Sequence, residues 1–194
     1  YVLTGTMKLD FPKLDLQPGK TFCLHIPHGF HEEESFVEAA VLRIAEEQGK
    51  SAVICRPAAQ RSGFLEFFRR QTSIKWLAKH AGTSEREAAR TISEFGIGVA
   101  TYLSGNAGTP RCLLGIAATL ASKPGVLIYS AAALDLSGCN RVHQYVQSKC
   151  NEACAVHISL PSVHGNGQPA QRICPNGAAC LSLEPMQIGG RTPP

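Results

Sequence analysis

The chain has 194 residues, of which 44% are hydrophobic and 18% charged, so a single domain can bury a core and a disordered protein is excluded. Its 19 Lys and Arg and 15 Asp and Glu give a net charge of +4, and because the basic residues do not cluster, nucleic-acid binding is not expected. The longest apolar stretches, at 112–120 and 125–133, are too short to cross a bilayer, so no direct membrane insertion is expected. Because Tyr1 is not an initiator residue, the chain can be a fragment of a longer protein.

The first third of the chain predicts strands flanking one helix. Residues 7–15 and 20–26 alternate apolar and polar side chains around a turn at 17–19, which indicates two strands. Residues 33–48 carry one apolar face and begin with acidic side chains, which favours a helix. The short apolar segment 51–55 then predicts a buried strand.

The middle of the chain, at about 63–108, predicts an inserted helical subdomain, after which strands and helices alternate again. The expected middle elements are short helices at 64–68 and 74–80, a helix beginning at 83–87, a glycine-rich stretch at 96–108 and a helix at about 110–122. The expected final elements are a buried strand at 125–130, a helix at 140–150, a buried strand at 154–159, a loop at 161–178 and a strand pair at 179–183 and 187–188. This order predicts one three-layer α/β domain over 1–194 with a mostly parallel sheet.

The eight cysteines contain no C-x-x-C pair, and we predict that they are reduced in a cytoplasmic protein. Four of them lie inside apolar runs, where a free thiol packs as a small hydrophobic side chain: Cys23, Cys55, Cys112 and Cys154. A zinc site is the alternative for the last four cysteines, although their spacings match no standard zinc motif: Cys150, Cys154, Cys174 and Cys180.

Three histidines form a second candidate metal site. His25, His28 and His31 recur at every third residue, ahead of carboxylates, and imidazoles in such numbers can bind a transition metal. Because Pro27 lies between them, a common facing direction is not expected. We therefore predict an incidental polar loop and no bound metal.

A series of short motifs between 102 and 138 has the order of a known family. Tyr102-Leu103-Ser104-Gly105-Asn106 is followed by Arg111, then by 117–128, which contains Leu-Ala and a Pro before an apolar strand, and then by 134–138. This order resembles the ATP-binding cassette (ABC) family of ATPase domains, which reads LSGG, a helix with a basic residue and ALA, a Pro before the Walker B strand, and then LD and a Gly. Further segments extend the resemblance over nearly the whole chain: 14–20, 84–97 and 181–190.

The resemblance implies a P-loop NTPase-like fold of the ABC type, with residues 26–35 at the phosphate-binding loop. Such a loop needs converging backbone N–H groups and a Lys for the phosphate oxygens. Here Glu32 stands at the Lys position, followed by Glu33 and Glu34. Because these carboxylates would repel a polyphosphate, we expect no nucleotide cofactor at the chain's own site.

Other positions of the family also lack their catalytic chemistry. Ser130 and Ala131 stand where the Walker B strand carries an Asp for Mg²⁺ and a Glu for the attacking water. Leu160 stands at the switch-histidine position, while His157 within the preceding strand is expected to be a core histidine. Gln60 is a candidate for the family's glutamine loop. The resemblance therefore implies a degenerate member, a pseudo-ATPase without catalytic residues.

The signature-like loop keeps part of the family's pattern. Ser104 and Gly105 are present, and Asn106, which tolerates a left-handed backbone, replaces the second Gly. In the family this loop contacts the γ-phosphate held by the opposite subunit, so the resemblance implies that Ser104, Gly105 and Asn106 can bind a partner's ATP in trans. The alternative is that Ser104 only caps the next helix, or that Gly105 and Gly108 only shape a loop.

We therefore expect a structural or regulatory partner in a larger assembly, such as a membrane transport or export machine. Its expected partner is a second copy, another subunit or a membrane permease, contacted through 64–68 and Trp76 unless these residues are core. The expected location is cytoplasmic or peripheral at the inner membrane. The alternatives are a nucleotide-binding subunit of a heteromeric ABC ATPase, and a ligand or metal sensor that reuses the crevice at the carboxyl ends of the strands.

Overall fold

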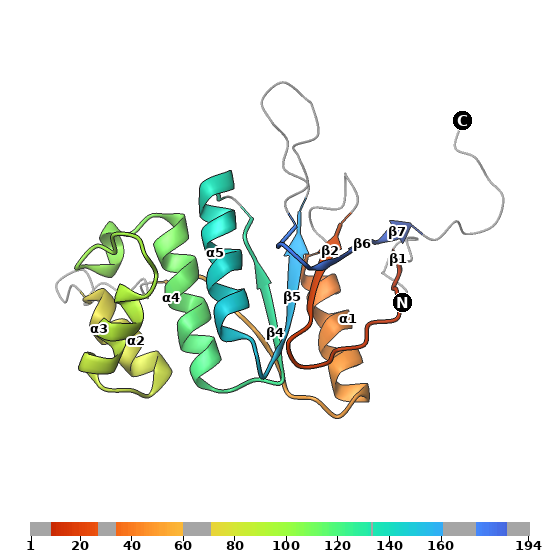
Figure 1. Ribbon diagram of the computed structural model, residues 1–194, viewed down its shortest axis with the longest axis horizontal. Coiled ribbons are helices and arrows are strands. Elements are labelled where there is room, and N and C mark those ends of the chain that lie inside the picture. Colours follow the sequence, from red (N-terminus) through yellow and green to blue (C-terminus); the bar gives the residue numbers. More distant parts are fainter. Residues whose placement is uncertain (1–8, 27–33, 60–70, 133, 161–173, 186–194) are drawn as a thin grey trace, which may run out of the picture.

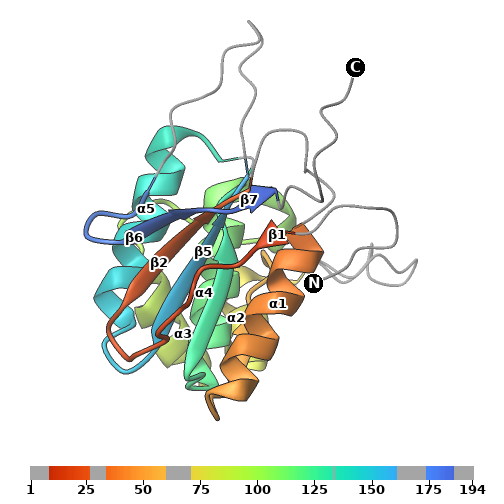
Figure 2. The same ribbon diagram turned by 90° about the vertical axis from the view of Figure 1, so that its right-hand side faces the viewer.

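Five parallel strands form the central sheet of the molecule (Figure 2), in the order β3-β4-β5-β2-β6. The computed structural model describes residues 9–26, 34–59, 71–132, 134–160 and 174–185. The strands of this sheet are β2 Thr21–His25, β3 Ala52–Ile54, β4 Val126–Ser130, β5 Cys154–Ser159 and β6 Ala179–Ser182. The helices are α1 Glu34–Glu47, α2 Ser73–Ala81, α3 Glu85–Ser93, α4 Gly108–Ala121 and α5 Leu136–Lys149.

Helices cover both faces of this sheet. Figure 1 shows α1 on one face and α4 and α5 on the other, with α2 and α3 beyond α4. Along β4, Val126 and Ile128 belong to the core beneath α1, whereas Leu127 and Tyr129 belong to the core beneath α4 and α5. Because both faces are covered, the strand carries apolar or aromatic side chains from Val126 to Tyr129, which is typical of a buried parallel strand. The α/β class, the largely parallel sheet and the layered arrangement are as predicted.

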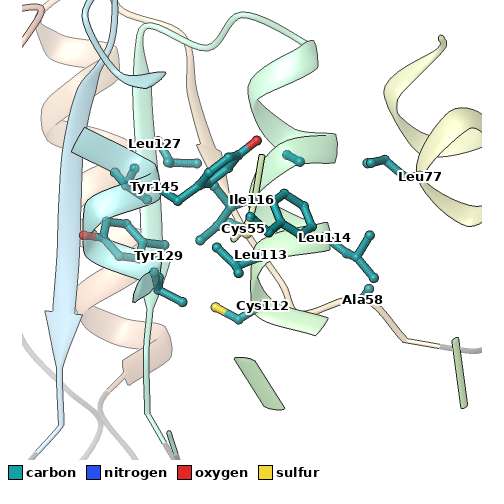
Figure 3. Packing of buried hydrophobic residues seen from close by; sticks show 14 of the residues in the cluster. Cys55, Ala58, Leu77, Cys112, Leu113, Leu114, Ile116, Leu127, Tyr129 and Tyr145 are labelled. Carbon is teal, nitrogen blue, oxygen red and sulfur yellow. The ribbon is translucent and has the colours of Figure 1, made fainter. Parts of the chain in front are cut away.

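Helix α4 lies between the sheet and α2, so it is buried on two sides. Figure 3 shows Leu113 and Ile116 of α4 near Leu127 of β4, with Leu77 of α2 on the far side. Leu113, Leu114 and Ile116 are fully buried. A helix covered on both sides needs apolar residues around most of its circumference, which explains the long apolar run in this segment.

Several element boundaries differ from the sequence predictions for local reasons. Helix α5 begins at Leu136, before the predicted position 140, because the Asp135 carboxylate accepts a hydrogen bond from the N–H of Gly138 at 2.7 Å and caps the helix. Helix α3 begins where predicted, with a reciprocal capping box between Ser84 and Glu87. Strand β3 was predicted to be buried, but it is an edge strand and Val53 is 37% exposed.

Short strands lie at both ends of the described chain. Within the described part of the predicted strand 7–15, residues 9–15, the strand is limited to β1 Leu9–Asp10, which pairs with β7 Glu184–Pro185 in a separate antiparallel sheet. Of the predicted final strand pair, the first strand is present as β6, which lies parallel to β2. This pairing covers the edge of β2, which otherwise would expose unpaired backbone groups. Residues 187–188 lie outside the described residues.

The helical layer buries Trp76, so this residue is not an exposed partner surface. Trp76 is 7% exposed, and its ring stacks on His80 at a centroid distance of 4.1 Å. The predicted helix at 64–68 lies outside the described residues. Among the helices of the described segments, none combines the length and apolar composition needed to cross a bilayer.

Candidate functional site

Ligands of open α/β sheets bind at the carboxyl ends of the strands, and none of the five described strands of the main sheet ends on an acidic residue. The five strands of the main sheet end at His25, Ile54, Ser130, Ser159 and Ser182. The Oγ of Ser130 accepts a hydrogen bond from the N–H of Ala132 at 3.2 Å, and Ala131 is buried. Neither side chain can supply the anionic oxygen that a Mg²⁺ ion prefers. The residues present at the end of β4 therefore do not fit a Mg²⁺–triphosphate group.

The first described carboxylate after β4 already has a structural partner. It belongs to Asp135, which caps α5 through the N–H of Gly138. At the end of β5, Leu160 packs against the core beneath α1. An apolar side chain therefore occupies the position at which the resemblance places a switch histidine. His157 is 4% exposed within β5, which confirms the prediction of a core histidine.

An ion pair crosses this edge between α1 and the segment after β3. The two Nη atoms of Arg56 donate to the two carboxylate oxygens of Glu38, each at 2.5 Å. The Glu38 side chain is only 5% exposed, whereas that of Arg56 is 61% exposed. The hydrogen bonds that the guanidinium donates to Glu38 raise the pKa of Arg56. Glu34 lies in the first turn of α1, and Glu32 and Glu33 are outside the described residues.

The signature-like loop is a short 3₁₀ helix, Leu103–Gly105, placed just before α4. Asn106 is 6% exposed and lies in the extended region, with φ −87° and ψ 136°, so it does not use the left-handed backbone that asparagine tolerates. Its Oδ1 accepts from the N–H of Ala100 at 2.8 Å, and its Nδ2 donates to Ser73 Oγ at 2.9 Å and to the carbonyl of Tyr102 at 3.2 Å. Asn106 therefore fastens the loop to α2.

Ser104 and Gly105 remain exposed on this fastened loop. The cap residue of α4 is Ala107, which makes no side-chain hydrogen bond to the helix, so Ser104 does not cap α4. A Cβ on Gly105 would lie 3.2 Å from the Cβ of Ala100, which fits a role in shaping the loop. Binding of a partner's phosphate by Ser104, Gly105 and Asn106 stays a prediction.

A row of polar side chains crosses the sheet face beneath α5. Tyr129, His157, Cys23 and Cys180 are register partners on neighbouring strands, so their side chains share one face. From α5, the Nδ1 of His143 lies 3.0 Å from the hydroxyl of Tyr129. We call these five residues the thiol–imidazole row.

The end of the row near β6 brings sulfur and imidazole atoms together. Cys23 Sγ lies 3.3 Å from Nδ1 of His157 and 3.8 Å from Nε2 of His25. The same Nε2 lies 3.1 Å from Sγ of Cys174, and Cys174 forms a disulfide with Cys180. The prediction that the cysteines are reduced is therefore wrong for Cys174 and Cys180, and the other six cysteines are buried thiols.

Comparisons with known proteins describe the fold but assign no family. No protein-family model matches the chain, and neither does any curated protein sequence. A solved chain of an inward-facing metal-chelate type ABC transporter matches with a TM-score of 0.52 and 14% identity, over 75% of this chain and 64% of that chain. The present chain thus corresponds to less than two thirds of the transporter chain. At this identity, the likeness concerns the fold alone.

The structure separates the residues of the four-cysteine metal site considered from sequence. Cys150 and Cys154 lie in the cores on opposite faces of the sheet, so they do not join Cys174 and Cys180. His28 and His31 lie outside the described residues. The cluster of Cys23, His25 and Cys174 was not predicted. The spacing of Cys23 and His25 along one strand indicates a shared face, but no local signal connects them to Cys174.

Substitution of Asn106 by alanine is expected to lower the free energy of unfolding by about 2 kcal/mol, because three backbone or hydroxyl groups lose their partner in a buried loop. Urea unfolding measures this loss. Ser104→Ala is the matched control in the same loop and is expected to change stability by less than about 0.5 kcal/mol, because Ser104 is exposed. Equal stabilities of the two variants would contradict the fastening role of Asn106.

The buried imidazole of His143 is expected to make the fold less stable in acid. Burial lowers its pKa from 6.5 to about 4, so below pH 6.5 the unfolded chain takes up a proton that the folded chain refuses until about pH 4. The free energy of unfolding then falls through this window, by about 2 kcal/mol at pH 5 for this group alone. Burial also lowers the pKa of His157, so some acid sensitivity remains without His143.

The comparison of His143→Gln with the wild type isolates this contribution. Glutamine keeps a hydrogen-bond partner for Tyr129 but does not titrate. Urea unfolding at pH 7 and pH 5 should show a smaller loss in the variant than in the wild type. The same loss in both proteins would mean that His143 is not the titrating group.

Proposed function

We propose that this chain is an ABC ATPase-like domain that does not hydrolyse ATP and serves as a structural or regulatory subunit of a larger assembly, with membrane transport as its expected setting. The observation that carries the proposal is the end of β4, where Ser130 and Ala131 replace the two acidic residues that the family resemblance requires. Hydrolysis of a triphosphate needs a held Mg²⁺ ion and an oriented water, and neither side chain supplies them.

Two further observations support this proposal. Leu160, at the expected switch position, packs against the core beneath α1 and offers no proton acceptor. The fold likeness to an ABC transporter chain agrees with the sequence motifs, although it concerns 64% of that chain. The same proposal includes a P-loop NTPase fold of the ABC type, a protein partner, and a cytoplasmic or membrane-peripheral location.

The proposal is tested by adding Mg-ATP to the purified chain. We expect no change in melting temperature and no phosphate release above the rate of the buffer. A ligand present at 100 times its dissociation constant stabilises the native state by about 2.7 kcal/mol, so binding would be visible as a clear upward shift. ADP and Mg²⁺ alone are the controls. A shift specific for ATP together with phosphate release would overturn the proposal.

A second candidate function is that of a subunit presenting its signature-like loop to a partner's nucleotide. The exposure of Ser104 and Gly105 on a loop held by Asn106 favours it. Self-association that depends on Mg-ATP, measured by sedimentation velocity and lost in Ser104→Arg, would replace the first proposal with this one. Unchanged sedimentation with Mg-ATP would count against the second candidate.

A further inference from the structure

Three side chains from distant parts of the chain offer metal ligands at one point. One ligand atom from each of Cys23, His25 and Cys174 lies within 4.8 Å of the others. The separations include 3.1 Å from His25 Nε2 to Cys174 Sγ and 3.8 Å from the same Nε2 to Cys23 Sγ. In a tetrahedral zinc site, neighbouring ligand atoms are about 3.3–3.8 Å apart, as the zinc–sulfur and zinc–nitrogen bond lengths require. The observed positions therefore need little rearrangement to surround a zinc ion.

A fourth thiol lies next to this group, although its sulfur is not among the three ligand atoms that lie within 4.8 Å of one another. Cys180 is the register partner of Cys23 on the neighbouring strand β6, and its sulfur is bonded to that of Cys174. Reduction of this disulfide would leave two thiols beside Cys23 and His25. Three cysteines and one histidine form one of the standard donor sets of closed, four-coordinate zinc sites.

The geometry points to a zinc site that forms when the Cys174–Cys180 disulfide is reduced. Its ligands are Cys23, His25, Cys174 and Cys180. This zinc site does not depend on the function proposed above, because its residues lie outside the expected phosphate-binding loop and the signature-like loop. Zinc, rather than magnesium or calcium, follows from the sulfur-rich donor set.

The redox step is an ordinary thiol–disulfide exchange with a cellular thiol or dithiol as reductant. The reductant's thiolate attacks Cys180 Sγ, the S–S bond breaks, and Cys174 leaves as a thiolate that takes up a proton. A second reductant thiol then releases Cys180 as a thiol, and the two reductant sulfurs form a disulfide, so two electrons pass from reductant to protein. Zinc binding subsequently displaces one proton from each thiol ligand.

One end of the cluster is open to solvent, and the ligands at the other end are buried. Cys180 is exposed and Cys174 half-buried, so reductant and zinc can reach this end of the site. Cys23 is fully buried and His25 is 6% exposed, which fixes the positions of these two ligands before the metal arrives. The Nδ1 of His157, 3.3 Å from Cys23 Sγ, is placed to donate a hydrogen bond to a thiolate there.

The test measures zinc binding to the whole chain in two redox states. One sample is reduced with a dithiol and freed of it without oxygen, and the other is kept oxidised. Competition with a chromophoric zinc chelator is expected to show one zinc bound per reduced chain and at least about 100-fold weaker binding to the oxidised chain. A pH indicator is expected to record proton release on binding to the reduced chain alone.

Variants identify the ligands. Cys180→Ser and Cys174→Ser remove ligands that are not deeply buried, so folding is preserved, and each is expected to weaken zinc binding at least about 100-fold. Cys139→Ser, at a buried cysteine in α5, is the matched control and should bind like the wild type. Circular dichroism checks the fold of each variant. The proposal is overturned if the reduced chain binds no zinc, if it binds only Cu(I), or if both ligand variants bind like the control.

Discussion

Replacement of Gly115 by alanine is expected to lower the free energy of unfolding by about 3 kcal/mol or more. A Cβ at this position would lie 2.1 Å from the carbonyl oxygen of Arg56 and 3.3 Å from the Cα of Pro57. These are backbone atoms, so no side-chain rotation relieves the clash. The segment is also tied to α4 by a hydrogen bond of 2.8 Å from the N–H of Ala58 to the carbonyl of Arg111, so α4 or the segment must move.

Close packing and helix propensity predict opposite changes in stability for Gly115→Ala. In the interior of an exposed helix, a change from glycine to alanine stabilises the helix by about 1 kcal/mol. Gly115 lies in the middle of α4, yet the expected change is a loss, because the helix approaches the segment after β3 closely. Urea unfolding measures it. Gly98→Ala is the control, since a Cβ there meets nothing within 4 Å, and similar midpoints for both variants would contradict the close approach.

The elements that could be predicted from the sequence are those with a local signal. Strands β4 and β5 are short apolar runs, and α1 has an apolar face, acidic first residues and a glycine after its end, so neighbouring residues alone specify them. The partner of β6 has no such signal. The pairing of β6 with β2 joins residues that are far apart in the chain, and only the unpaired edge of β2 explains it.

Some residues of the candidate site could likewise be placed from the sequence, and others could not. The positions of Ser130 and Ala131 at the end of β4 follow from the strand prediction and from the family resemblance. The role of Asn106 does not, because its amide binds groups on α2 and on its own loop that only the fold brings together. The contact of His25 with Cys174 spans 149 residues, and the disulfide of Cys174 changes its chemistry, so the sequence-based expectation of reduced cysteines failed there.

Replacement of Arg56 by alanine is expected to destabilise the fold by about 3 kcal/mol, because it leaves the carboxylate of Glu38 unpaired in a buried position. The Glu38 side chain is 5% exposed and both its oxygens accept from Arg56 at 2.5 Å. Glu38→Ala is expected to cost clearly less. The Arg56 side chain is 61% exposed, so water solvates its charge after the partner is lost.

The test compares the loss of unfolding free energy in Arg56→Ala with the loss in Glu38→Ala. Urea unfolding of both variants at pH 7 measures the two losses. The double variant Glu38→Leu with Arg56→Met removes both charges, and we expect it to regain most of the stability lost in Arg56→Ala, since a buried ion pair contributes little beyond what apolar packing supplies. Arg56→Lys keeps the charge but not the paired donors, and should fall between the wild type and Arg56→Ala. A larger loss in Glu38→Ala than in Arg56→Ala would show that the pair acts through Arg56, holding the segment after β3, rather than through the burial of the carboxylate.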